Sequence, residues 1–175
     1  TQGQKVTVDK SGTLTETTSG VGGDIIERHK KLGKDPKNVI SLWVEAAIRT
    51  QRGEPGAEEA LGYLTIRYKK EGSWGRENHF WKKIKSNAPC FRALVDGATP
   101  ENGYKVDLDN IQIKLRDDKL NSSDGDKWFI ITSGADTPRP VYLQKSNQTG
   151  LYFINNFSSL HVDVKRVVGD EETFK

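Results

Sequence analysis

The side chains in this sequence that could do chemistry are few and lie far apart. The single cysteine, Cys90, stands between a proline and a phenylalanine, which is typical of a small buried apolar residue and not of a catalytic thiol. The three histidines, His29, His79 and His161, show no metal-binding spacing such as His-Glu-x-x-His. A metal site would require the fold to gather them, and we predict neither a metal nor a cofactor.

Nucleophilic and acid–base motifs are also missing from the sequence. It contains no Gly-x-Ser-x-Gly elbow and no Ser-x-x-Lys core. Neighbouring acidic residues flank the Gly/Ser turn near residues 117–126 or lie in the C-terminal tail, where we expect solvated carboxylates. We therefore expect a non-enzymatic protein. The alternative, a hydrolase with a dispersed site, would need a deep pocket with clustered Asp, Glu or His.

One stretch of the chain carries an excess of positive charge. Between residues 67 and 85 there are seven basic and two acidic residues, against a formal charge of +3 for the whole chain. Interleaved aromatic residues are typical of single-stranded nucleic-acid binding, although helical core stripes beside a solvated lysine face give the same pattern. Nucleic-acid binding through this basic face is our alternative function. Its basic residues are Arg67, Lys69, Lys70, Arg76, Lys82, Lys83 and Lys85.

Two loops rich in proline and glycine share a partial motif. They read GATPENGY (97–104) and SGADTPRP (133–140), and both place Thr-Pro shortly after Gly-Ala. Proline fixes one backbone angle and Asn-Gly tolerates positive φ, so both segments are predicted to be rigid corners. Two prolines in the second loop remove amide donors, which favours an edge or a crossing over a central strand. Because exposed rigid loops often bind partners, we predict a contact surface at Thr99, Glu101, Asn102, Asp136 and Arg139.

The elements that position these loops begin with a short N-terminal hairpin, predicted over residues 5–17. The Gly-rich segment 18–23 is interpreted as a flexible joint, with phosphate binding by its amides as the less favoured alternative. Apolar residues then recur at three- and four-residue steps and predict four helices. We expect them at residues 24–33, after an Asp35-Pro36 start up to about 51, at 57–72, and at 76–86.

From about residue 90 the hydrophobic period changes to alternation. Strands are predicted over 105–116, with a bulge at 109–110, and in KWFIIT, PVYLQK, LYFINN and LHVDVK. Helices followed by an antiparallel sheet of four or five strands define an α+β protein. We divide the chain into a hairpin and joint (1–23), one α+β domain (24–168) and a tail (169–175). Within the domain, residues 24–90 form the helical half and residues 91–168 the β half.

The composition is that of a globular chain. The sequence has 175 residues, of which 34% are hydrophobic and 29% are charged, and no apolar run approaches the roughly 20 residues of a membrane helix. One cysteine excludes an internal disulfide and leaves the compartment open. The chain contains no methionine, so we interpret it as a processed or trimmed product. We expect a soluble protein with no membrane span, cytoplasmic in preference to secreted.

Three segments together resemble an uncharacterised bacterial family, domain of unknown function 6935. They are GATPENGY, WFIITSGADTPRPVYLQK and GLYFINNFSSLHVDVK, and the resemblance covers roughly residues 24–168. The chain departs from the family pattern at Tyr104-Lys105-Val106, where Thr-Pro is usual, and it lacks the usual acidic-Pro-Trp ending. The resemblance implies a bacterial or phage source and a helix-then-sheet order, and it brings no catalytic residues. Our leading hypothesis is a non-enzymatic module that binds another protein.

Overall fold

Helices precede most of the strands along the chain, as the sequence predicts. The computed structural model describes residues 3–7, 20–66 and 78–169. Its helices and antiparallel sheet confirm the predicted α+β class. The described helices are α1 (Gly20–Leu32), α2 (Pro36–Gln51), α3 (Ala57–Leu64) and α5 (Asn78–Lys85).

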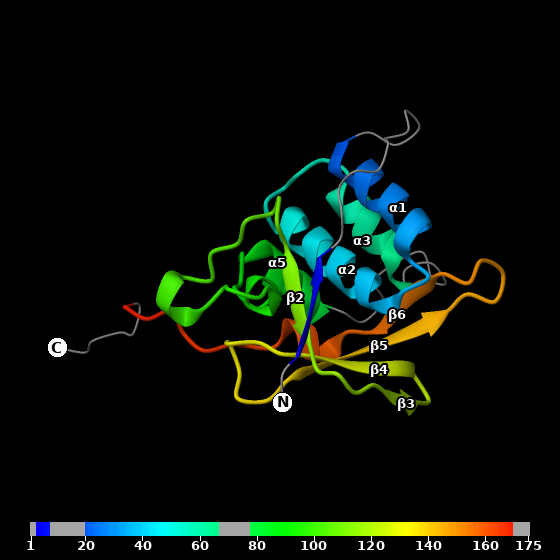
Figure 1. Cartoon of the computed structure of the whole chain (residues 1–175). Helices are drawn as coiled ribbons and strands as arrows, with labels where there is room; N and C mark the ends of the chain where they lie inside the picture. The colour runs from blue at the N-terminus through cyan, green and yellow to red at the C-terminus, as the bar shows by residue number, and fades with distance from the viewer. Residues whose placement is uncertain (1–2, 8–19, 67–77, 170–175) are drawn as a thin grey trace.

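The sheet is antiparallel and has the strand order β1-β2-β4-β5-β6, with β3 paired to β4. In Figure 1, α1, α2 and α3 gather on one side of the β4–β5–β6 ribbon, and none of the described helices covers its other face. The strands are β1 (Gln4–Thr7), β2 (Gln112–Leu115), β3 (Leu120–Ser122), β4 (Gly125–Ile130), β5 (Arg139–Lys145) and β6 (Tyr152–Asn156).

Helix α2 is the centre of the molecule. Asp35 caps its first turn by accepting a hydrogen bond from the Lys37 amide at 3.0 Å, and Pro36 occupies the first helical position. Residues 39–49 are all buried, so α2 is covered on every side along three turns. It contacts β1, β2 and β6 as well as the other three described helices. A helix that is buried all round belongs to the core, which explains its weakly amphipathic sequence.

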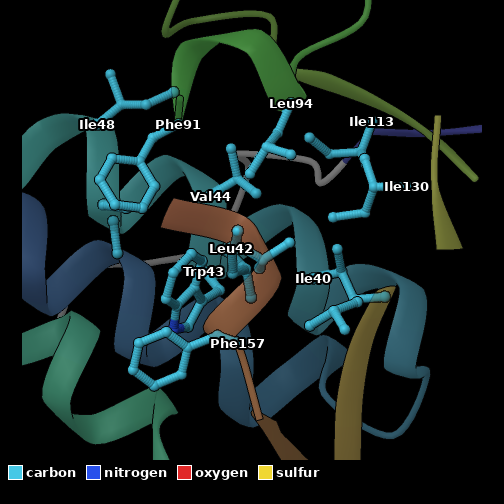
Figure 2. Packing of buried hydrophobic residues seen from close by; sticks show 14 of the residues in the cluster. Ile40, Leu42, Trp43, Val44, Ile48, Phe91, Leu94, Ile113, Ile130 and Phe157 are labelled. Atoms are coloured by element: carbon cyan, nitrogen blue, oxygen red, sulfur yellow. The ribbon is translucent and has the colours of Figure 1, made fainter. Parts of the chain in front are cut away.

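The core is built around Trp43 of α2. Its ring lies 5.3 Å from that of Phe157 and 6.0 Å from that of Phe91, between ring centroids, and Figure 2 shows the three side chains together. The indole nitrogen donates a hydrogen bond to Thr65 Oγ1 at 3.1 Å, so its polar atom is satisfied in the interior. Phe80 of α5 also packs against the Trp43 ring, at 6.1 Å. These aromatic contacts join α2, α5 and the C-terminal segment.

A buried ionic network fastens α1 to α2. Arg28, which is fully buried, donates to both carboxylate oxygens of Glu45 at 3.1 and 2.8 Å and also pairs with Asp24. Arg49 donates to Glu45 at 2.9 Å and to Glu54 at 2.7 Å. Burial lowers the pKa of Arg28, but the hydrogen bond and charge of Glu45 outweigh it, so the pKa lies above its ordinary value. Since every charge has a partner, we assign this network a structural role.

The flexible joint predicted at 18–23 is wrong where the structure describes it. Gly20–Gly23 form the first turn of α1, four residues before the predicted start. A Cβ atom at Gly22 would lie 2.1 Å from the carbonyl oxygen of Gly56, so glycine is required here for close contact between two backbones. Residues 18 and 19 lie outside the described part of the chain, as does most of the predicted hairpin. Its first strand is present as β1, which pairs with β2 of the domain sheet.

Of two predicted strands, 105–116 is a strand only near its end, as β2, and LHVDVK is not a strand. The segment 106–109 folds locally, because the Asp107 side chain accepts from the Asp109 amide at 2.9 Å and the Asp107 carbonyl accepts from the Asn110 amide. The segment LHVDVK does not join the sheet, since Ser158–His161 is a short 3₁₀ helix and residues 162–166 are irregular. Conversely, the segment NSSDGD is predicted as a turn alone, but its first residues belong to β3, which forms a tight hairpin with β4.

Two other expectations are corrected in detail. Helix α3 is predicted over 57–72 but ends at Leu64, because Thr65 is extended and forms a parallel bridge with Ile154 of β6. Residues 67–72 of the predicted helix lie outside the described residues. Pro140 lies in β5, an interior strand of the sheet. It pairs with Phe129 of β4, and the β6 register begins only at Tyr142, so the proline occupies a local edge as its missing amide requires.

Candidate functional site

Two of the predicted contact residues of the first loop, Thr99 and Asn102, form hydrogen bonds within the loop itself. Asn102 Oδ1 accepts from the amides of Thr99 and Lys105 at 2.9 and 3.1 Å, and its Nδ2 donates to the Gly97 carbonyl at 2.9 Å. The Thr99 hydroxyl accepts from the Asn102 amide, which completes a capping box around Pro100–Asn102. Of the predicted residues here, Glu101 points to solvent as an exposed side chain. The Asn102 amide group is therefore a structural element of the corner.

The second loop is fastened to the first loop and to the C-terminal segment. Ser133 Oγ donates to the Ala98 carbonyl at 2.6 Å, and the Tyr104 hydroxyl donates to the Lys165 carbonyl at 2.5 Å. The Lys165 amide in turn donates to the Gly134 carbonyl at 2.9 Å. We call the assembly of residues 97–104, 132–140 and 163–168 the clasp. Its three parts are far apart in sequence and are joined almost entirely by hydrogen bonds to backbone groups.

Asp136 and Arg139 lie in the clasp but do not pair with each other. Asp136 forms an exposed ion pair with Lys165 at 2.7 Å, which lowers the pKa of the Asp136 carboxyl group and raises that of Lys165. Arg139 donates to the Asp163 carbonyl at 3.0 Å. Neither side chain is brought to Asn102 by a described contact. The predicted surface is thus a set of internal ties, and its role in binding stays a prediction.

The basic face is described only in part. Arg67, Lys69, Lys70 and Arg76 lie outside the described residues. Of the others, Lys82 and Lys85 are exposed on α5, whereas Lys83 is mostly covered and pairs with Asp163. Phe80, on the same helix, is fully buried in the core, as a helical core stripe requires. Nucleic-acid binding through this face stays a prediction.

The fold brings two of the three histidines together. His79 Nδ1 and His161 Nδ1 are 2.8 Å apart, so one ring donates a hydrogen bond and the other accepts it. Near them, a cavity of about 420 Å³ is lined by Lys83, Cys90 and Asp163, among others. Burial raises the pKa of the Cys90 thiol to about 11, which keeps it protonated and unreactive. Among the described residues no three His, Cys, Asp or Glu side chains form a group able to hold a metal ion.

A larger cavity lies elsewhere among the described residues. It is a hollow of about 660 Å³ between the end of α3 and the β5–β6 hairpin, and we call it the hairpin hollow. Apolar atoms of Tyr63, Ile66, Leu151 and Phe153 line most of it. Polar side chains form the rest of the lining, namely Lys30, Gln144, Lys145, Ser146, Gln148 and Thr149. An apolar interior with a few polar groups is the usual composition of a binding site.

Tyr63 and Phe153 form an aromatic wall of the hairpin hollow, and the His29 ring packs against both of them. The ring Nε2 lies 2.7 Å from the Tyr152 carbonyl oxygen, which can only accept, so Nε2 carries the hydrogen. In the neutral ring Nδ1 then accepts from the Tyr63 hydroxyl at 2.9 Å. Burial raises the pKa of Tyr63, and the Glu27 carboxylate raises it further, so the hydroxyl keeps its proton. The Tyr63 ring is therefore held in one orientation before any ligand arrives.

Two further features hold this wall in place. The Phe153 ring packs 4.7 Å from His29 and 5.7 Å from Tyr63, between ring centroids. Gly33 lies against the same imidazole, and a Cβ atom there would come within 2.9 Å of His29 Nε2. Gly33, predicted as a helix stop, thus also makes room for the ring. Its carbonyl accepts from the Tyr152 amide at 2.8 Å, which ties the end of α1 to β6.

The described lining of the hairpin hollow offers hydrogen-bonding groups and an aromatic surface. None of the described side chains that line it carries a carboxylate or an imidazole. Its ionisable groups are two lysines and a tyrosine whose pKa is raised. General acid–base catalysis needs a group that titrates near neutral pH, and nucleophilic catalysis needs a neighbouring base. The lining supplies hydrogen-bond donors and an aromatic surface instead.

Sequence reasoning missed this site because its residues come from three separate segments. His29 and Tyr63 lie in two predicted helices, and nothing in the sequence pattern links them to each other. One signal was present in LYFINN, where Tyr152 and Phe153 stand side by side. Adjacent residues of a strand point to opposite faces, so consecutive aromatics indicate that both faces of β6 carry packing or binding surfaces.

The comparison with known families identifies the chain at the level of its domain. The family described as Domain of unknown function (DUF6935) matches residues 23–168. The chain belongs to this family. The DUF6935 match includes both loops of the clasp and the described lining of the hairpin hollow. A search of curated proteins found no match, and neither did a search of solved structures. Within the described residues no helix has the length and apolar character needed to cross a membrane.

Proposed function

We propose that this DUF6935 protein is a non-enzymatic binding module, and that its hairpin hollow receives an apolar side chain of a partner protein. The observation that carries the proposal is the aromatic wall of the hollow, held in place by the hydrogen bonds of His29 to Tyr63 and to the Tyr152 carbonyl. Ordering a side chain costs free energy when a complex forms. A wall that is ordered beforehand avoids that cost.

A side chain of a partner suits this hollow better than an enclosed small molecule does. Small-molecule pockets bury most of their ligand, whereas this hollow opens beside the exposed hairpin turn at 146–150. Protein interfaces combine an apolar centre with a polar rim, and the hollow has both. Its apolar floor fits one aromatic or branched aliphatic anchor, and its rim can hydrogen-bond the backbone around that anchor.

The experiment that tests this proposal measures binding of N-acetylphenylalanine amide, a neutral ring-bearing probe, by ligand-observed NMR. Gln148→Trp should fill the mouth of the hollow and abolish binding, because Gln148 is an exposed lining residue. Thr137→Trp, at an exposed position of the clasp, is the matched control and should leave binding unchanged. Equal binding by native protein and Gln148→Trp, or binding abolished by Thr137→Trp alone, would contradict the proposal.

A further inference from the structure

Three lysines converge around the mouth of the hairpin hollow. Lys30 in the last turn of α1 and Lys145 at the end of β5 line it directly. Lys34 lies beside them, because a Cβ atom placed at Gly150 would be 3.9 Å from Lys34 Cε and 4.0 Å from Lys145 Cε. Lys30 and Lys34 lie four residues apart around the end of α1, whereas Lys145 belongs to β5, so the fold brings Lys145 to the other two.

These charges are poorly compensated within the molecule. In the described part of the chain, neither Lys34 nor Lys145 forms an ion pair with a carboxylate. Lys30 lies 3.5 Å from Glu27, with more than half of its side chain exposed, and such surface pairs contribute little. The carbonyl end of α1 favours nearby cations, which accounts for the lysines at the end of this helix but not for Lys145, which belongs to β5.

The hydroxyl groups of the rim already accept hydrogen bonds from amides of the hairpin turn. Ser146 Oγ accepts from the amides of Gln148 and Thr149, both at 3.3 Å, and Thr149 Oγ1 accepts from the Leu151 amide at 3.2 Å. Each hydroxyl keeps a hydrogen that can be donated outward. Gln144 and Gln148 add side-chain amide donors. A rim of ammonium, hydroxyl and amide donors around an apolar floor is complementary to anions.

We infer that the segment received by the hairpin hollow is an acidic peptide, in which Asp or Glu residues flank one apolar anchor. This inference rests on the proposed function and names the chemistry of its partner. We favour carboxylates over a phosphate group, because the cations are lysines, each of which presents a flexible point charge. No arginine fork, the usual partner of a phosphate, lies among the described lining residues.

The test compares three fluorescent peptides of one length, each with a central phenylalanine flanked by Glu, Gln or Lys. The Glu peptide should bind about tenfold more tightly than the Gln peptide at low salt, which is the size expected of a few exposed ion pairs. This advantage should shrink as salt rises. It should also vanish in the double variant Lys34→Gln/Lys145→Gln, whose exposed sites leave the fold intact, while Lys82→Gln/Lys85→Gln on α5 should change nothing.

The outcomes separate the inference from the proposed function. Equal binding of the Glu and Gln peptides, both blocked by Gln148→Trp, would overturn the acidic preference and keep the hollow as a binding site. No binding of any peptide, together with no binding of the neutral ring probe, would overturn both. Tighter binding of a single-stranded oligonucleotide that is lost in the Lys34→Gln/Lys145→Gln variant would also overturn the inference, since it would assign the lysines to nucleic acid.

Discussion

The clasp and the hairpin hollow are both built from loops against the sheet, yet they use their polar groups in opposite ways. In the clasp, Asn102, Ser133 and Tyr104 all direct their hydrogen bonds inward to backbone groups. At the rim of the hollow, Lys30, Lys145 and Gln148 are exposed to solvent. The difference teaches that proline-stiffened, glycine-rich loops indicate where a chain must be fastened, whereas binding requires polar groups that the fold leaves unused.

Among the substitutions that test this contrast, we expect the largest loss of stability when the Tyr104 side chain is removed from the clasp. Its side chain is fully buried and its hydroxyl bonds the Lys165 carbonyl. Tyr104→Ala should therefore lower the free energy of unfolding by about 4 kcal/mol, as measured by urea denaturation. In the fraction that remains folded, the affinity of the Glu peptide should be unchanged. A loss of affinity larger than the loss of folded protein would break the separation between the two regions.

Cys90 provides a second test, because it lies beside the part of the clasp that contains Asp163 and Lys165. Burial raises its pKa from an ordinary 9.0 to about 11, so at pH 8 the folded protein holds about a hundredfold less thiolate than the unfolded chain. Alkylation by iodoacetamide should be slower by at least that factor in the native protein. Tyr104→Ala should restore much of the rate. A native rate equal to that of the unfolded chain would contradict the closed clasp.

The same shift predicts a pH dependence of stability. Because the folded pKa lies above the unfolded one, the contribution of the protonated thiol is present below about pH 9 and is lost as pH rises through about 11. Cys90→Ser should remove that dependence at alkaline pH while leaving the clasp hydrogen bonds in place.

Asn102→Ala should have an intermediate effect. It removes three hydrogen bonds and the capping box, and we expect a loss of about 2 kcal/mol in the free energy of unfolding. Glu101→Gln, at the exposed neighbouring position, is the control and should change stability by less than about 0.5 kcal/mol. A marked loss of peptide affinity in Asn102→Ala with unchanged stability would instead make this residue a contact, as the sequence predicts.

The smallest expected effect lies in the wall of the hollow. Tyr63→Phe keeps the ring but deletes the hydrogen bond to His29, so the free energy of unfolding should fall by about 1 kcal/mol. The neutral ring probe should bind only a few times more weakly, because the ring remains and only its orientation is less fixed. If stability and affinity are both unchanged in calorimetry and NMR titration, the His29 contact does not organise the site.

The sequence was informative wherever structure is decided locally. The Asp35-Pro36 start and the apolar stripe of α2 predict that helix closely, and alternation predicts β4, β5 and β6. The same alternation wrongly predicts a strand around Asp107, because the hydrogen bond that its side chain accepts from the Asp109 amide stabilises a turn. Position 22 shows another limit. Glycine is required there because the backbone of Gly56 lies against it, and no local sequence pattern reveals that contact.

The candidate site was beyond prediction for a related reason. Its cations, Lys30, Lys34 and Lys145, are ordinary surface lysines in the sequence, and only the fold brings Lys145 of the β5–β6 hairpin to the two lysines at the end of α1. Conversely, the sequence motif that attracted attention, GATPENGY, is conspicuous because turn geometry restricts its residues. The restricted composition of this loop is accounted for by its turn geometry.

The most direct test of the central claim is a map of backbone amide shifts in the native protein as the Glu-flanked phenylalanine peptide is added. The account predicts that the perturbed amides cluster at residues 63–66 and 144–153, with few changes in the clasp. Perturbations centred on residues 97–104 and 133–140, with the hairpin hollow silent, would contradict it and return the binding surface to the two proline-rich loops.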